Sequence, residues 1–203
     1  MGDFIRHAPC KHCNSSDALA VYTDSIHCFS CDYHEDGDFT EYGDAKMSTA
    51  TELKIINKSA KAIIERGINS STVMFYGVNV DNEQHSYPYH DKDSNLVAYK
   101  HREIATKSFS VSGNIKDSLL FGQHLFSGGG RYVTITEGEL DALAAYQMLG
   151  SKYPVVSIKS GAKSALKDCK SNYEFLDSFE HIVISFDNDA PGIAAANEVA
   201  ELF

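Results

Sequence analysis

Apolar and polar positions alternate in a regular rhythm through the last third of the chain. The apolar runs "RYVTIT", "YPVVSI" and "HIVISF" are each followed by a short polar loop and then by a helix-like segment. Apolar runs of this length joined by helical segments are typical of a parallel sheet covered by helices. Residues 131–203 are therefore predicted to form a parallel sheet with flanking helices.

The preceding residues, 51–130, show shorter and more mixed patterns. In "SAKAIIERGINSSTVMFYGV", the "RG" pair is predicted to end one helix and "NSST" to cap a second. In "HSYPYHDKDSNLVAYKHREI", two alternating runs around "DKDSN" indicate a β-hairpin. The fold class is thus α+β followed by α/β.

Four of the five cysteines stand in two tight pairs within residues 1–40. Paired CxxC knuckles can bring four thiolates around one zinc ion, and so short a segment needs a bound ion of this kind to fold. The runs "AVY" and "IHCF" flank the turn "TDS", which favours a small zinc ribbon. Nearby histidines are then surplus to the metal and expected at the surface. The predicted zinc ligands are Cys10, Cys13, Cys28 and Cys31.

Charge is unevenly distributed along a chain whose formal net charge is −10. That total argues against a nucleic-acid partner, which normally meets a basic face. However, the acids concentrate in residues 32–44, whereas residues 96–116 and 159–170 are basic. Residues 41–50, which begin within this acidic stretch, are predicted to be a linker. The basic stretches remain candidates for phosphate contacts, with ordinary solvated faces as the alternative.

Polar residues gather where the three predicted parallel strands end. Ligands of such sheets bind at the carboxyl ends of the strands. Carboxylates collected there would repel one another unless a divalent cation neutralised them, and oxygen ligands favour magnesium or manganese. The alternative is that these acids only cap helices. The residues in question are Glu137, Lys159, Asp187 and Asp189, with Asp141 one helical turn after Glu137.

No stretch approaches the length of a membrane-spanning helix, and the polar first ten residues lack the apolar core of a signal peptide. A soluble, cytoplasmic protein is expected. No GxxxxGK[ST] phosphate loop is present either.

"TEGELDAL", followed some fifty residues later by "SFDNDAPG", resembles the TOPRIM signature of bacterial-type primases, topoisomerases and related nucleases. With the ribbon ahead of it and "ERGINSSTVMFYGV" and "NLVAYKHRE" between, the whole arrangement is similar to the primase half of podophage primase-helicases. This resemblance implies an enzyme that makes short RNA primers on single-stranded DNA from ribonucleoside triphosphates. It also implies a helicase and a DNA polymerase as partners, and the cytoplasm of the phage's host as location.

The resemblance also implies residue roles. It assigns Glu137 to the reacting 3′ hydroxyl or to metal, and Asp141, Asp187 and Asp189 to divalent metal. Nucleotide phosphates would be contacted by Lys100, Arg102, Lys107 and Lys159, and template bases by Asp24 and His27 of the ribbon.

Two features limit the resemblance. The family carries a further metal-binding acid on a later strand, so a C-terminally incomplete TOPRIM sheet is expected, and the helicase half is not encoded in these residues. Two other functions remain open: a non-catalytic zinc and TOPRIM DNA-binding recombination mediator, and a TOPRIM nuclease or topoisomerase. The mediators carry a helix-hairpin-helix before their zinc element, and a topoisomerase needs a nucleophilic tyrosine; neither feature is evident.

Overall fold

The computed structural model describes residues 2–8, 10–13, 18–39, 53 and 60–203. The chain divides into two compact units, Met1–Thr49 and Ala50–Phe203, here called the ribbon unit and the core unit. The predicted linker, residues 41–50, lies outside the described residues.

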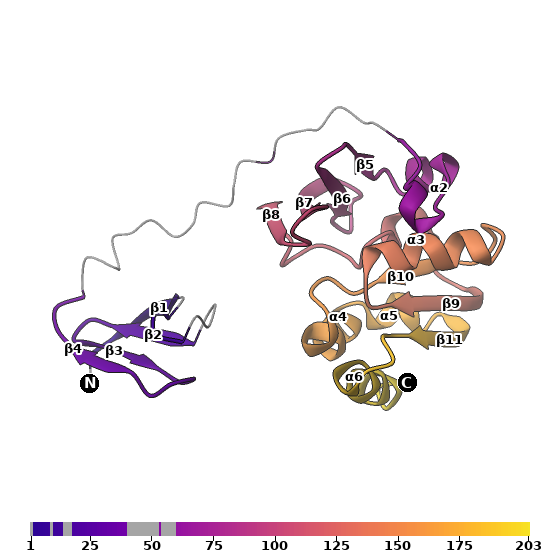
Figure 1. Ribbon diagram of the computed structural model, residues 1–203. Helices are drawn as coiled ribbons and strands as arrows, with labels where there is room; N and C mark the ends of the chain where they lie inside the picture. The colour runs from indigo at the N-terminus through magenta and orange to yellow at the C-terminus, as the bar shows by residue number, and fades with distance from the viewer. Residues whose placement is uncertain (1, 9, 14–17, 40–52, 54–59) are drawn as a thin grey trace. The chain divides into compact units, whose positions relative to one another are not determined.

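The ribbon unit contains an antiparallel sheet in the order β1-β2-β3-β4 (Figure 1). The predicted hairpin around "TDS" is confirmed, with β2 and β3 pairing antiparallel on either side of that turn. A sheet of so few short strands buries little apolar surface, which is why its stability depends on the cysteines. The strands are β1 Phe4–Ala8, β2 Leu19–Tyr22, β3 Ser25–Cys28 and β4 His34–Asp36.

The first part of the core unit is an antiparallel sheet in the order β5-β6-β7-β8. The predicted hairpin is confirmed as β6 and β7, and Asp91 closes their turn by accepting from the main-chain N–H groups of Asp93 and Asn95 at 2.9 Å each. The strands are β5 Asn79–Val80, β6 Gln84–His90, β7 Leu96–Glu103 and β8 Phe109–Gly113.

The two predicted helices before this sheet differ in outcome. The second is confirmed as α2, Ser70–Phe75, which is capped by the Asn69 side chain accepting from the N–H of Thr72 at 2.8 Å. In place of the first, the described residues show one 3₁₀ turn, η1 Ile64–Arg66. Gly67 ends it with a φ of 65°, a left-handed conformation that glycine adopts without strain.

The second part of the core unit is the predicted parallel sheet, in the order β10-β9-β11. Helix α3 lies on one side of this sheet, and α4 and α6 lie on the other (Figure 1). The strands are β9 Gly130–Thr136, β10 Val155–Ser157 and β11 Phe179–Ser185. The helical segments are η2 Gln123–Leu125, α3 Glu139–Met148, η3 Ala162–Ser164, α4 Ala165–Ser171, α5 Tyr173–Leu176 and α6 Ala190–Ala200.

Side chains on the two faces of the parallel sheet belong to different cores, because successive side chains of a strand point to opposite faces. Val155 of β10 joins a core with α3 and the antiparallel sheet, whereas Val156 joins a core with α4 and α6. Cys169, the fifth cysteine, is fully buried in the latter core, and burial raises the pKa of its thiol to about 12.

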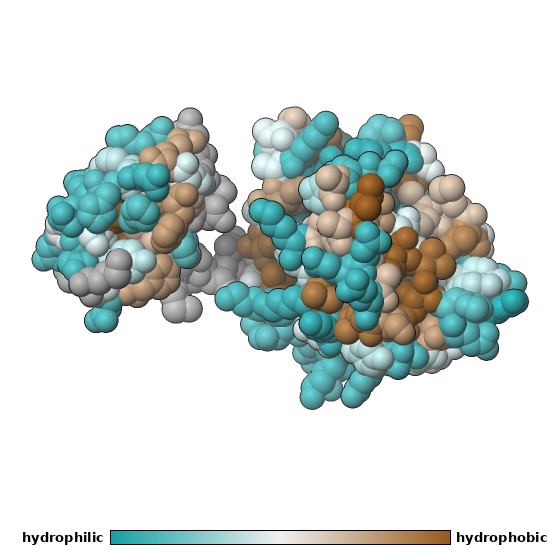
Figure 2. Space-filling view, turned by 90° about the horizontal axis from the view of Figure 1, so that it is seen from below, coloured by the Kyte–Doolittle hydropathy of each residue, from teal (hydrophilic) through white to brown (hydrophobic). Residues whose placement is uncertain are grey.

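Apolar side chains also reach the surface of the core unit. Figure 2 shows them gathered on the side seen from below, where α6 lies. Val183 of β11 and Ile193 of α6 are among the exposed large apolar residues. No helix of the described residues is both long and apolar enough to span a membrane.

Candidate active site and zinc centre

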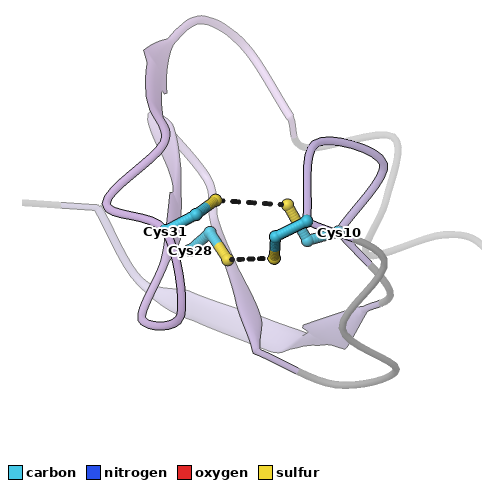
Figure 3. A group of neighbouring side chains, drawn as sticks. Cys10, Cys28 and Cys31 are labelled. Carbon is cyan, nitrogen blue, oxygen red and sulfur yellow. Dashed lines mark hydrogen bonds between the residues drawn. The ribbon is translucent and has the colours of Figure 1, made fainter.

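The four predicted zinc ligands converge in the ribbon unit, and Figure 3 labels Cys10, Cys28 and Cys31. Their sulfur atoms all lie within 4.8 Å of one another, with Cys10 to Cys31 at 3.8 Å and Cys13 to Cys28 at 3.6 Å. Tetrahedral zinc with bonds of about 2.3 Å holds its sulfur ligands about 3.8 Å apart. The spacing therefore fits zinc and exceeds that of a disulfide.

Asp24 and His27, the two ribbon residues predicted to contact the template, have different surroundings. The Asp24 carboxylate accepts from the Ser25 hydroxyl at 3.0 Å, and the main-chain N–H of Gly2 lowers its pKa. These contacts give Asp24 a structural role in the turn, which sequence reasoning did not foresee. His27 instead pairs across the sheet with His34, and its ring meets the exposed ring of Phe29 edge to face at 4.9 Å.

In the core unit, the strand ends form a cleft of about 540 Å³. Three of the four predicted catalytic acids line this cleft: Glu137 follows β9, Asp141 lies in the first turn of α3, and Asp187 follows β11. The antiparallel sheet also contributes to the lining, with Lys100 on β7 and Phe109 and Val111 on β8.

The Glu137 carboxylate connects the loops that follow two strands of the parallel sheet. Its Oε1 accepts from the N–H of Ala162 at 3.2 Å, and its Oε2 accepts from the N–H of Asp187 at 3.3 Å. One carboxylate thus links the loop after β10 to the loop after β11 and fixes the width of the cleft floor.

The acids of the cleft act on one another electrostatically. Lost hydration raises the pKa of Asp141, and the negative charge of Asp187 raises it further. Such repulsion is what a bound cation would relieve. However, the four-cysteine group is the only cluster spaced for a metal among the described residues, so the four acids do not meet around a single point here.

Asp189, the fourth predicted acid, is not among the residues lining the cleft. It is the N-cap of α6, and its Oδ1 accepts from the N–H of Gly192 at 2.8 Å. A Cβ on Gly192 would lie 2.2 Å from the carbonyl oxygen of Asp187, so only glycine permits this tight turn. Helix capping, the alternative explanation of "DND", therefore describes the observed contact of Asp189.

Of the four predicted phosphate-binding residues, Lys100 alone lines this cleft. Its Nζ lies 2.7 Å from Oε1 of Glu139, donates to the carbonyl of Lys159 at 2.9 Å, and sits 4.8 Å from the ring centre of Phe109. Glu139 also accepts from the hydroxyl of Tyr89 at 2.6 Å. Sequence reasoning missed Glu139, Phe109 and Val111, because none belongs to the motif positions that suggested chemistry.

Arg102 and Lys107 do not line the cleft. Arg102 is half-buried on β7, two residues after Lys100, and pairs in register with Phe109 of β8. Lys107 is exposed in the turn between β7 and β8, where its φ is 59°. Their predicted contacts with nucleotide remain predictions.

Lys159, the fourth residue predicted to contact phosphate, is bonded within the protein. Its side chain is buried, and its Nζ donates to the carbonyls of Lys116 at 3.1 Å and Ser118 at 3.0 Å. The Asp168 carboxylate lies 3.8 Å from the same nitrogen. Burial lowers the pKa of Lys159, while Asp168 opposes that shift. Through these contacts Lys159 connects the two parts of the core unit.

Comparisons with known proteins agree with this architecture. A Toprim-like family profile matches residues 134–203. The DNA helicase/primase of Enterobacteria phage T3 is 36% identical over 217 aligned residues, which include 98% of this chain. The chain spans 38% of the length of that relative.

Among solved structures, phage primases are also similar to this chain. The primase fragment of the bacteriophage T7 primase-helicase is 32% identical, with a TM-score of 0.70 over 98% of this chain and 86% of that one. The T7 lagging-strand polymerase structure, with gp4 primase domains bound to an RNA/DNA hybrid and dTTP, matches at 38% identity and a TM-score of 0.65, covering 71% and 75% of the two chains. The DnaG catalytic core, 14% identical with a TM-score of 0.52 over 68% and 57%, shares the fold.

The four-cysteine ribbon, the Toprim-like sheet with acids at its carboxyl edge and the likeness to the phage primases together place the chain in the class of Toprim primases. The resemblance and fold class inferred from the sequence are confirmed. Within that class, the chain belongs to the family of the T7-type phage primases, the primase portion of the primase-helicases.

Proposed function

We propose that this chain is a DNA primase that joins ribonucleoside triphosphates into short RNA primers on a single-stranded DNA template. The observation that carries the proposal is the cleft itself. Glu137, Asp141 and Asp187 line it together with Lys100. Carboxylates beside a nearby cation suit a reaction in which a 3′ hydroxyl attacks a triphosphate.

The donor set of the cleft fits magnesium or manganese, because carboxylate oxygens suit these ions and the mutual repulsion of Asp141 and Asp187 favours a cation. Asp141 and Asp187 would hold the ion, with Glu137 beside them and Asp189 through the oxygen that does not cap α6. A bound divalent ion supplies charge neutralisation at the phosphates and makes a hydroxyl oxygen more nucleophilic.

The other roles belong to the chain's own residues. Lys100 orients the triphosphate by charge, and Arg102 and Lys107 extend the basic wall toward the β7–β8 turn. The exposed ring of Phe109 offers a flat apolar surface to a base. The ribbon carries structural zinc and presents His27 and its neighbouring rings to the template.

The likeness to the T3 and T7 proteins supports two further partners, a replicative helicase activity and a DNA polymerase. We place the reaction in the cytoplasm of a phage-infected host cell. A recombination mediator or a nuclease would use the same fold, so the product distinguishes them: primers are synthesised RNA, whereas a mediator binds DNA without new product and a nuclease shortens it.

The test uses the full chain, single-stranded DNA oligonucleotides of varied sequence, labelled ribonucleotides and magnesium. Template-dependent oligoribonucleotides are expected, and Asp187→Asn should abolish them because it removes one charge from the cleft. Asp93→Asn, in the exposed β6–β7 turn, is the matched control and should match wild type. Absence of product from the wild-type chain, or full activity of Asp187→Asn, would contradict the proposal.

A further inference from the structure

Glu139 is a charged residue that the predicted chemistry leaves without a role. It is the second glutamate of "TEGELD", and only 4% of its side chain is exposed. A buried carboxylate costs free energy unless it is paired and hydrogen-bonded. Here one oxygen receives both the Tyr89 hydroxyl at 2.6 Å and the Lys100 Nζ at 2.7 Å.

The Lys100 ammonium group is held from several directions. Besides Glu139, it donates to the Lys159 carbonyl at 2.9 Å and lies 4.8 Å from the centre of the Phe109 ring. Its side chain is 13% exposed, although it lines the cleft. An ammonium group has three donors, and two are engaged by the protein, which leaves one for a ligand.

The partners of Lys100 are themselves fixed. Tyr89 is fully buried on β6, and Lys159 is anchored by its main-chain N–H to Oδ2 of Asp168 at 2.8 Å. A free lysine samples many rotamers, and ordering it when a ligand binds costs entropy. In this cleft the Lys100 side chain is already ordered in the folded protein, so a ligand that binds there does not bear that cost.

We infer that Glu139 is a positioning residue that holds the Lys100 ammonium at one place on the cleft wall, with its remaining donor available to a phosphate group. The inference rests on the proposed function for the identity of the ligand, a ribonucleoside triphosphate. Because Glu139 also cancels the charge of Lys100, it favours orientation of the triphosphate over affinity for it.

The first test measures the placement of Lys100 without relying on activity. The full chain is acylated with the N-hydroxysuccinimide ester of acetic acid, and the rate at each lysine is followed by peptide mass spectrometry. In Glu139→Gln the rate at Lys100 should rise by about tenfold, as expected from loss of one charge-assisted hydrogen bond. The rate at Lys159, which Asp168 holds separately, should not change. An unchanged rate at Lys100 would overturn the inference.

Two further variants complete this test. Tyr89→Phe removes the other hydrogen bond of Glu139 and should raise the rate at Lys100 by a smaller factor, even if Glu139→Gln folds poorly. Glu198→Gln, a matched change at an exposed position of α6, should leave the rate at Lys100 as in wild type. Equal rates at Lys100 in Tyr89→Phe and wild type would mean that this network does not position it.

The second test separates orientation from binding in primer synthesis. In Glu139→Gln, kcat should fall by about tenfold, because misplacement of a binding group acts on the reacting geometry. The KM for ribonucleotide should stay equal or decrease, because the cleft loses a negative charge. A wild-type kcat, or a raised KM alone, would refute the positioning role. A wild-type chain without activity would instead contradict the proposed function, and the acylation rates would still decide the inference.

Discussion

The buried pair of Lys159 and Asp168 allows a sharp test of whether Lys159 supports the fold or binds nucleotide. Asp168 is 5% exposed and accepts from the Lys159 N–H at 2.8 Å and from the Ser164 hydroxyl at 3.1 Å. Replacing Asp168 by alanine removes three interactions at once, counting the ion pair at 3.8 Å. Lys159 then keeps two carbonyl partners but loses its ion-pair partner.

Breaking one side of a buried ion pair typically costs about 3–5 kcal/mol. A unit of about 150 residues loses about 2–4 °C in Tm for each kcal/mol, so a fall of roughly 10 °C is expected. Lys159→Met should cost a comparable amount. It removes the ion pair and both hydrogen bonds of Nζ to main-chain carbonyls, while Asp168 keeps the main-chain N–H and the Ser164 hydroxyl.

Urea unfolding of the full chain, followed by the signal of the core unit, gives both free energies. The double variant should lose less than the sum of the single variants, since they share one interaction. The reasoning fails if Asp168→Ala costs less than about 1 kcal/mol, the scale of an exposed pair. It also fails if Lys159→Met loses nucleotide affinity without losing stability, because that result would restore Lys159 to the binding site.

Three further outcomes are expected. Asp141→Asn should abolish primer synthesis yet raise Tm at neutral pH. The raised pKa of Asp141 means that its ionised form weakens the fold, so the contribution of Asp141 to stability falls as pH rises above 3.8, and the gain of the variant over wild type should shrink on acidification toward that value. Equal Tm values for variant and wild type at pH 7 would contradict this. Elemental analysis of the wild-type chain should find one equivalent of zinc, and Cys28→Ser should abolish it and unfold the ribbon unit, while the core unit still melts cooperatively; retained zinc in Cys28→Ser would disprove the four-thiolate site. Asp189→Ala should cost about 1 kcal/mol through loss of the α6 cap, whereas Asp189→Asn should keep the cap; equal losses in urea unfolding would rule capping out.

The sequence predicted the elements whose signals are local. Alternating runs around "DKDSN" gave the β6–β7 hairpin, and repeated strand, loop and helix gave the parallel sheet. The paired cysteine knuckles predicted the four-cysteine cluster, whose spacing suits zinc. The first predicted helix was wrong in the described residues, because Gly67 closes a single 3₁₀ turn there.

The site was harder to predict because it is built from contacts between distant segments. Lys100 and Lys159 look alike in sequence, yet one lines the cleft and the other is enclosed by carbonyl oxygens. Likewise Glu139 reads as an ordinary polar residue of a first helical turn. Its pairing with Lys100 depends on how the antiparallel sheet packs against α3, and no local pattern records that packing.

The double hydrogen bond of Glu137 has a consequence for how its role can be studied. Each of its two oxygens receives a main-chain N–H, from Ala162 and from Asp187. Alanine would release both loops, and glutamine would turn an N–H donor toward one of these N–H groups. Any replacement therefore changes the shape of the cleft together with its charge, so loss of activity in a Glu137 variant does not by itself identify a metal ligand. Titrating metal into the wild-type chain, with the carbonyl and carboxylate signals of Glu137 followed by isotope-edited infrared spectroscopy, separates the two effects.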